Sequence, residues 1–112
     1  MGLLIRWIVA IIAVFVAAKL VPGIHFDNLT ALALFAAVLG LVNAVIRPVL
    51  KLLALPLIIL TFGLVSLIIN ALMFLLAAYV VPGFSVDGFI SALIGSIIVS
   101  IVGAILSMVV PQ

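Results

Sequence analysis

The sequence predicts an all-α, polytopic membrane protein whose four transmembrane helices form two repeated hairpins of parallel topology. Two observations carry this prediction. Hydrophobic residues fill 71% of the 112 positions and charged residues only 5%, whereas a soluble domain needs roughly a quarter of its residues charged to cover its surface. Segments of the first half also recur in the second half at a fixed distance. With a mean hydropathy of +1.88, the chain is expected to have lipid as its solvent.

The length of the chain limits the number of crossings. A bilayer core about 30 Å thick takes about 20 residues of helix per crossing, so four crossings use about 80 residues and leave about 32 for ends and loops. Residues 1–112 are therefore expected to form a single integral membrane domain. The first apolar run is expected to remain as a span, because no signal-peptide cleavage pattern follows it.

Proline and glycine set the limits of the first two spans. Apolar residues occupy positions 3–21 except for Arg6 and Lys19. The following Pro22-Gly23 pair is expected to end the first helix, because proline cannot continue the hydrogen-bond ladder and glycine permits a reversal. The next few residues are expected to form only a loop. Asp27 or Asn28 is then a natural N-cap for a second span over residues 29–46.

A basic, proline-bounded segment is expected to separate the second span from the third. Arg47-Pro48 should end the second span, and residues 47–56 are predicted to form an interfacial linker. Arg47 and Lys51 are four residues apart, so any helical turn here places both cations on one face, as in segments that meet anionic headgroups. Alternatively, they serve only as positive-inside topology markers. The third span is predicted over residues 57–81.

The two halves of the chain resemble each other. A shift of 60 residues superimposes Ala17–Asp27 on Ala77–Asp87 through the pattern Ala-Ala-x-x-Val-Pro-Gly-x-x-x-Asp. The pattern predicts an internal duplication, with repeat 1 at about residues 8–46 and repeat 2 at about 68–106. A fourth span is predicted over residues 88–110. Because each repeat holds two spans, both halves are expected to enter the membrane in the same direction, about an axis along its normal.

The basic residues predict the orientation of the spans. With a cytoplasmic N-terminus, Arg6, Arg47 and Lys51 lie inside and only Lys19 lies near the outer face. The positive-inside rule therefore places both termini in the cytoplasm, in a bacterial inner membrane. The long side chain of Lys19 can reach the outer headgroups. Trp7 lies near a span end, where interfacial aromatic residues are common.

Small residues at helical spacing predict where helices pack. The 60-residue shift aligns two such stripes: Ala36, Gly40 and Ala44 on the second span, and Ser96, Ser100 and Ala104 on the fourth. A second stripe on the fourth span contains Ser91, Gly95, Gly103 and Ser107. Small residues let helix backbones approach closely in lipid. Two small faces on one helix suggest one neighbour within the chain and one in a homo-oligomer, although glycine and serine are also simply common in membrane helices.

Three polar side chains are candidates for an intramembrane role. Asn70 is predicted to lie at mid-membrane depth in the third span, with Ser66 one turn earlier on the same face. An amide there needs a partner. It either bonds to another helix or lines a polar path. Asn43, near the cytoplasmic end of the second span, has the same two interpretations and could also cap the helix end.

The sequence contains no recognisable catalytic or cofactor site. Asp27 and Asp87 could form a cation site at the outer mouth, but helix capping explains both. His25 has neither a neighbouring carboxylate pair nor any Cys or Glu with which to bind a metal. No nucleophile–base pair or phosphate-binding loop is found. An enzyme, a cofactor, a metal site and an identifiable small-molecule substrate are therefore not expected, and four scattered cations form no nucleic-acid surface.

Several short motifs resemble those of the bacterial four-span family known as phage-holin-like, superfamily IV, which includes the YvlD-type membrane proteins. The match extends over nearly the whole chain, and its Asn-x-x-x-Arg-Pro and Asn-Ala signatures are fairly specific. The resemblance implies a small inner-membrane protein with four spans, often chromosomal, whose holin label is itself an analogy. The motifs are Leu41–Pro48 (LVNAVIRP), Leu55–Leu57 (LPL), Thr61–Leu64 (TFGL), Ile68–Leu72 (IINAL) and Val81–Phe84 (VPGF).

These observations lead to one functional expectation and two alternatives. The chain is expected to be a small, oligomerising, non-catalytic membrane protein of the holin-like family, with lipid and copies of itself as partners. The first alternative is a channel or carrier for a small solute, built at the repeat interface around Asn70 and Ser66. The second is an accessory subunit of a larger membrane complex. A fold-level name is weak support for pore formation.

Overall fold

The computed structural model describes residues 2–61 and 63–109 of the chain. Residue 110, the predicted end of the fourth span, and the side chain of Arg47 lie outside the described part. The helices and strands follow one another as α1 (Gly2–Leu20), β1 (Ile24–Phe26), α2 (Leu29–Leu60), α3 (Leu64–Val80), β2 (Phe84–Val86) and α4 (Phe89–Val109). The predicted all-α class with four helices is confirmed.

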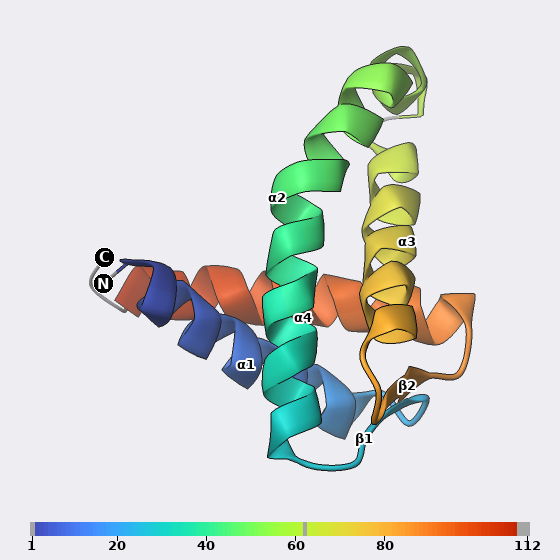
Figure 1. Ribbon diagram of the computed structural model, residues 1–112. Coiled ribbons are helices and arrows are strands. Elements are labelled where there is room, and N and C mark those ends of the chain that lie inside the picture. The colour runs from blue at the N-terminus through green and yellow to red at the C-terminus, as the bar shows by residue number, and fades with distance from the viewer. Residues whose placement is uncertain (1, 62, 110–112) are drawn as a thin grey trace.

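The four helices form two crossed pairs. Helices α1 and α4 lie side by side, as do α2 and α3. The α1–α4 pair runs crosswise to the α2–α3 pair, and the two strands lie where the pairs meet (Figure 1). The N-terminal end of α1 and the C-terminal end of α4 lie at the same, far end of the α1–α4 pair. All four helix ends that flank the Pro-Gly pairs therefore converge on one corner of the molecule, which measures 40 × 34 × 22 Å.

Three of the described helices are long and apolar enough to cross a membrane: Gly2–Leu20, the Leu29–Leu53 part of α2, and Phe89–Val109. The fourth, α3, is equally apolar but has 17 residues. This length is at the lower limit for a helix that crosses a bilayer core about 30 Å thick. The helices thus agree with four spans, of which α3 is the shortest.

The predicted helix end at Arg47-Pro48 is wrong, and so is the separate linker over residues 47–56. Helix α2 continues through Pro48 and Pro56 to Leu60 and contains 32 residues. Proline removes one backbone hydrogen bond and crowds the preceding turn, which either kinks a helix or ends it. Such kinks are tolerated in membrane helices, where neighbouring groups satisfy the freed carbonyl. In Figure 1, the C-terminal part of α2 bends toward α3.

The reversal between α2 and α3 lies at Thr61 to Gly63, so the third helix begins at Leu64 and not at the predicted residue 57. Gly63 has a φ of 90°, a left-handed conformation that favours glycine. The Thr61 hydroxyl accepts a hydrogen bond from the Val65 amide at 3.3 Å, and the Thr61 carbonyl accepts one from Leu64 at 3.2 Å. These bonds occupy amides of the first turn, which have no partner within a helix.

The two segments expected to be loops instead form a small antiparallel sheet. Strand β1 pairs with β2 in the register Ile24 with Val86, His25 with Ser85, and Phe26 with Phe84. We call this pair of strands the ribbon. Its central pair, His25 and Ser85, consists of positions 60 residues apart, so the same offset that relates the two halves of the sequence also relates the two strands.

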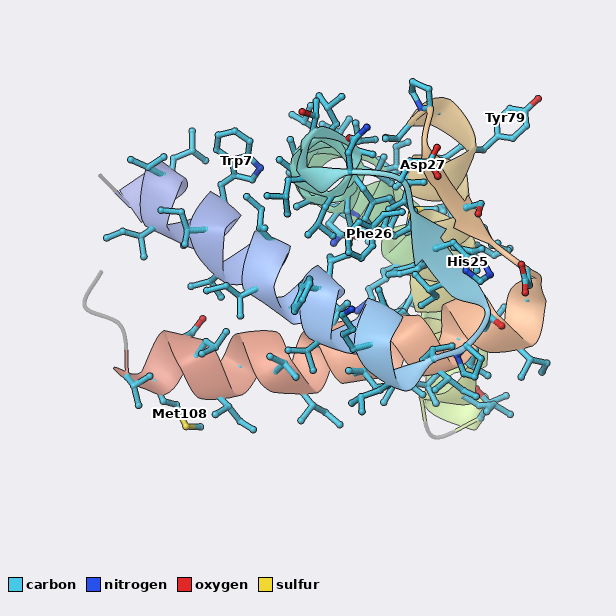
Figure 2. All side chains as sticks on the ribbon, turned by 90° about the horizontal axis from the view of Figure 1, so that it is seen from below. Trp7, His25, Phe26, Asp27, Tyr79 and Met108 are labelled. Carbon is cyan, nitrogen blue, oxygen red and sulfur yellow. The ribbon has the colours of Figure 1, made fainter. Side chains whose placement is uncertain are left out.

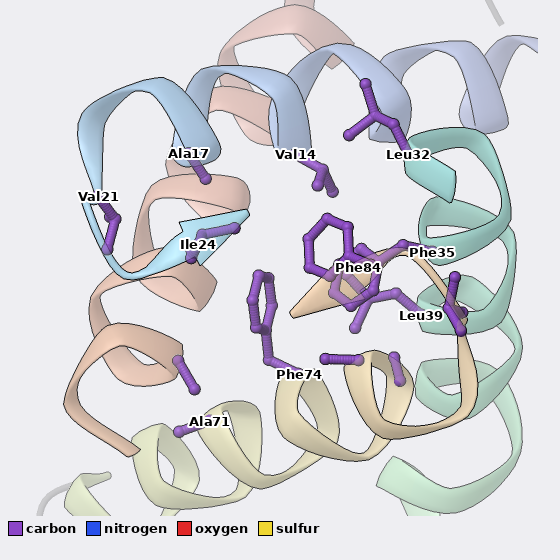
Figure 3. Packing of buried hydrophobic residues seen from close by; sticks show 14 residues of the cluster. Val14, Ala17, Val21, Ile24, Leu32, Phe35, Leu39, Ala71, Phe74 and Phe84 are labelled. Carbon is purple, nitrogen blue, oxygen red and sulfur yellow. The ribbon is translucent and has the colours of Figure 1, made fainter. Parts of the chain in front are cut away.

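The hydrophobic core lies directly against the ribbon. Three aromatic rings form its centre, as Figure 3 shows. Phe35 of α2 stacks on Phe84 of β2 at a centroid distance of 3.7 Å and meets Phe74 of α3 edge-on at 4.8 Å. Phe35 and Phe74 are both completely buried. Such aromatic pairs contribute more than their buried area, so this cluster ties α2 and α3 to each other and to β2 of the ribbon.

Candidate functional site

Two glycines at the ribbon make equivalent contacts with the other half of the chain. The Gly23 carbonyl accepts a hydrogen bond from the Asp87 amide, and the Gly83 carbonyl accepts one from the Asp27 amide, each at 2.8 Å. A Cβ atom on Gly23 would collide with Ser91 of α4. One on Gly83, whose φ is 85°, would lie 3.1 Å from the Cβ of Ala31 of α2. Each glycine thus lets its chain reversal rest directly on a helix of the other half.

The carboxylates of Asp27 and Asp87 do not have the capping role expected of them. Asn28 is the N-cap of α2, because its Oδ1 accepts a hydrogen bond from the Ala31 amide at 2.8 Å. The Asp87 carboxylate instead lies 3.4 Å from Nε2 of His25. The sequence did not indicate this contact because the two residues meet only through the ribbon. With both side chains more than half exposed, the pair contributes little stability.

The polar candidates Asn70 and Ser66 lie nearer to a helix end than predicted. Because α3 begins at Leu64, Ser66 is in its first turn and Asn70 in its second. Asn43 lies within α2, beside Val42, which shares a small buried cluster with Ile69. Asn43 and Asn70 are therefore at similar heights along the α2–α3 pair.

Among the residues that the structure describes, neither of these two amides forms the helix-bridging bond expected of it. The Oδ1 atoms of Asn43 and Asn70 are buried and have no hydrogen-bond partner among the described residues. Burying an amide oxygen without a partner costs about 1–3 kcal/mol. This cost makes both positions candidates for a contact with a group outside the chain.

Replacing Asn70 with leucine is expected to raise the free energy of unfolding of the monomer by about 1 kcal/mol, because the variant no longer buries an unpaired amide. Steric-trap unfolding in detergent would measure the change. Ser66→Ala, one turn away at a partly exposed position, is the control and should have little effect. A loss of stability in Asn70→Leu would show that the amide does have a partner, as the interhelical hydrogen bond predicted from the sequence requires.

The small-residue stripes divide between the inside and the outside of the fold. Ala36 and Ser96 are buried, and a Cβ on Gly95 would collide with Ile24 and lie 3.4 Å from Phe74. The later members of the stripes are different. Around Gly40 and Gly103, an added Cβ would meet nothing within 4 Å. Of the other members, Ala44, Ser100, Ala104 and Ser107 are exposed and Ser91 is partly exposed.

A groove separates the N-terminal half of α1 from the middle of α2. It encloses about 780 Å³, and its walls include Leu3, Arg6 and Trp7 of α1 with Ala36, Gly40 and Asn43 of α2. The indole Nε1 of Trp7 donates a hydrogen bond to the carbonyl of Ala33 at 3.0 Å, and Figure 2 shows the ring directed from α1 toward α2. The sequence indicated an interfacial position for Trp7 but gave no sign of this groove.

Basic residues lie at both ends of α1 and within α2. Arg6 lies near its N-terminus, and Lys19 lies in its last turn, beside the ribbon. The ammonium of Lys19 is 5.3 Å from the centre of the Phe15 ring, an arrangement typical of a cation–π contact. Lys51 lies within α2. The two carboxylates of the chain immediately follow β1 and β2, so acidic residues are confined to the ribbon end.

Comparison with known proteins identifies the family. Residues 1–105 match the family described as Mycobacterial 4 TMS phage holin, superfamily IV. The chain belongs to this family. An uncharacterised protein of Streptomyces coelicolor is 42% identical over 97 residues, which cover 83% of this chain and 78% of the relative. No solved structure matches the chain. This holin-family member is thus a multi-pass membrane protein in contact with lipid.

Proposed function

We propose that this holin-family protein works as a homo-oligomer without catalytic activity, in the bacterial inner membrane and with both termini in the cytoplasm. The observation that carries the proposal is one face of α4. Ser100, Gly103, Ala104 and Ser107 recur at intervals of three and four residues, which places them on one side of the helix. In lipid, such small residues allow close contact between helices.

The first half of α4 supports the assignment of this face to a second copy. Gly95 and Ser96 pack inside the chain, whereas Ser100, Ala104 and Ser107 are exposed. A Cβ on Gly103 would meet nothing within 4 Å. Copies of a membrane protein share one orientation, and oligomers are usually symmetric, so a ring about the membrane normal is the arrangement we propose. The non-catalytic role rests on the family and on a sequence without Cys or Glu.

The orientation rests on the basic residues. Arg6 and Lys51 are on the side that the positive-inside rule assigns to the cytoplasm, and the ribbon is then outside. A membrane-impermeant maleimide should label His25→Cys, in the exposed centre of β1, in whole cells. Protection of this cysteine until the cells are opened would reverse the orientation.

Replacing Gly103 with leucine is expected to convert the oligomer to a monomer, because the larger side chain holds the helix backbones apart. The control is Ile105→Leu, at an exposed position on another side of α4. Native mass spectrometry and cross-linking in native membranes would measure the assembly. The proposal would be refuted if the wild-type protein were monomeric at all protein concentrations. It would also be refuted if Gly103→Leu left the oligomer unchanged.

A second candidate function, a channel or carrier for a small solute, is favoured by the unpaired amides of Asn43 and Asn70. Polar groups inside a membrane often mark such paths. Leakage and flux assays on liposomes that contain the purified protein would distinguish the candidate functions. Leakage of a large dye indicates a holin-like lesion, and selective flux of small solutes indicates a channel or carrier. The absence of both, together with a stable co-purifying protein, indicates an accessory subunit.

A further inference from the structure

We propose that the groove between α1 and α2 binds one anionic phospholipid, with its phosphate on Arg6 and an acyl chain along α2. This inference is independent of the oligomer proposed above, because the groove and the exposed small face of α4 are formed by different helices. It assigns a specific ligand to a site that neither the sequence motifs nor the family description points to.

The dimensions and walls of the groove suit an acyl chain. Its volume of about 780 Å³ lies within the range of about 300–1,000 Å³ typical of small-molecule sites. The α2 side is formed mainly by small residues, among them Ala36, Gly40 and Ala44, with Leu41 and Asn43 beside them, and a Cβ on Gly40 would enter empty space. This side is therefore a shallow apolar channel along the helix.

The other wall favours a lipid over a helix from a second copy. On the α1 side, the groove is lined by large side chains, including Leu3, Leu4 and Trp7. Helix backbones approach most closely where both partners offer small residues, and these large side chains would hold the backbone of a second helix farther away. A flexible acyl chain can follow the same uneven surface.

The charge of Arg6 determines the kind of lipid. Arg6 lines the groove and forms no ion pair within residues 2–61 and 63–109. Asp27 and Asp87 lie beyond the other end of α1, and the helical path from Arg6 to Leu20 alone is about 21 Å. A guanidinium next to hydrocarbon needs an anion, and its planar fork matches a phosphate group. An anionic phospholipid supplies the phosphate and a net negative charge.

Trp7 sets the position of the headgroup. Its indole N–H is already bonded to Ala33, so the ring is held across the groove next to Arg6. The bonded tryptophan and the unpaired arginine therefore form the polar end of the groove, and the small residues of α2 form its apolar part.

Lipid retention by the purified full-length protein tests the proposal. The protein is offered equal amounts of dioleoyl phosphatidylglycerol and dioleoyl phosphatidylcholine, and bound lipid is counted by native mass spectrometry. The wild type should prefer phosphatidylglycerol about fivefold, the ratio that corresponds to about 1 kcal/mol per basic residue near an anionic surface. Arg6→Gln should lose this preference and Arg6→Lys should keep most of it. Lys19→Gln, a control for charge at the ribbon end, should not change it.

Two glycine variants then locate the site. Gly40→Leu should lose both lipids, because its side chain fills the groove, yet remain helical by circular dichroism and keep its oligomeric state. Gly103→Leu, with an equally unobstructed Cβ, should keep the lipid and lose the oligomer. Full preference in Arg6→Gln, an equal loss in Lys19→Gln, or unchanged lipid in Gly40→Leu would each overturn the proposal. Dispersal of the oligomer by Gly40→Leu would show that a second copy occupies the groove.

Discussion

Replacing Phe35 with alanine is expected to lower the free energy of unfolding by about 3 kcal/mol, the lower end of the range for a buried phenylalanine. Phe35 is completely buried, and its ring contacts both Phe84 and Phe74. In lipid, the unfolded chain still keeps its phenylalanine in an apolar solvent. The loss therefore comes mainly from the cavity and from the ring contacts.

Steric-trap unfolding of the detergent-solubilised protein would measure this loss. Phe89→Ala is the matched control, since Phe89 is 38% exposed and its removal leaves no closed cavity. We expect its effect to be below about 1 kcal/mol. Equal losses in the two variants would show that the aromatic cluster does not stabilise the contact of α2 and α3 with the ribbon.

Replacing Gly95 with leucine is expected to destabilise the single chain by at least 1–3 kcal/mol, the usual cost of overpacking a core. A Cβ at this position already collides with Ile24 of β1 and lies 3.4 Å from Phe74. The rest of a leucine side chain would push the ribbon away from α4. The variant should therefore lose stability even where the protein is monomeric.

Gly103→Leu is the control for this prediction. Both glycines lie on α4 and belong to the same predicted stripe, but only Gly103 has open space around its Cβ position. Gly103→Leu should leave the unfolding free energy of the monomer within about 0.5 kcal/mol of the wild type. Should Gly95→Leu change only the oligomeric state, then Gly95 would lie at an interface between copies and not in the core.

The sequence predicted the class of the fold and the limits of the first and last helices, because long apolar runs and Pro-Gly pairs are local signals. It failed at Pro48 and Pro56. A proline can end a helix or only bend it, and the outcome depends on neighbouring helices that a local pattern does not describe. The true start of the third helix, at Leu64 after Thr61 and Gly63, has weaker residue signals than the two prolines.

The candidate sites were less predictable because they depend on contacts between distant segments. The pairing of His25 with Asp87 and the bond from Trp7 to Ala33 require the crossed arrangement of the helices. The small-residue stripes were visible as a pattern. Their division into buried members, such as Gly95, and unoccupied ones, such as Gly103, follows only from the tilt of α4 across its neighbours.

The ribbon also has a consequence for how the chain is made. Its two strands belong to different helical hairpins. During synthesis, β1 therefore has no strand to pair with until β2 has been made. The pairing is possible only if the translocation machinery delivers both reversals to the same compartment. A chain with one hairpin inserted upside down would leave β1 with unbonded edges and Phe35 without its stacked neighbour. The ribbon would thus distinguish correctly inserted molecules from inverted ones, and an unpaired strand would be a signal open to quality-control proteases.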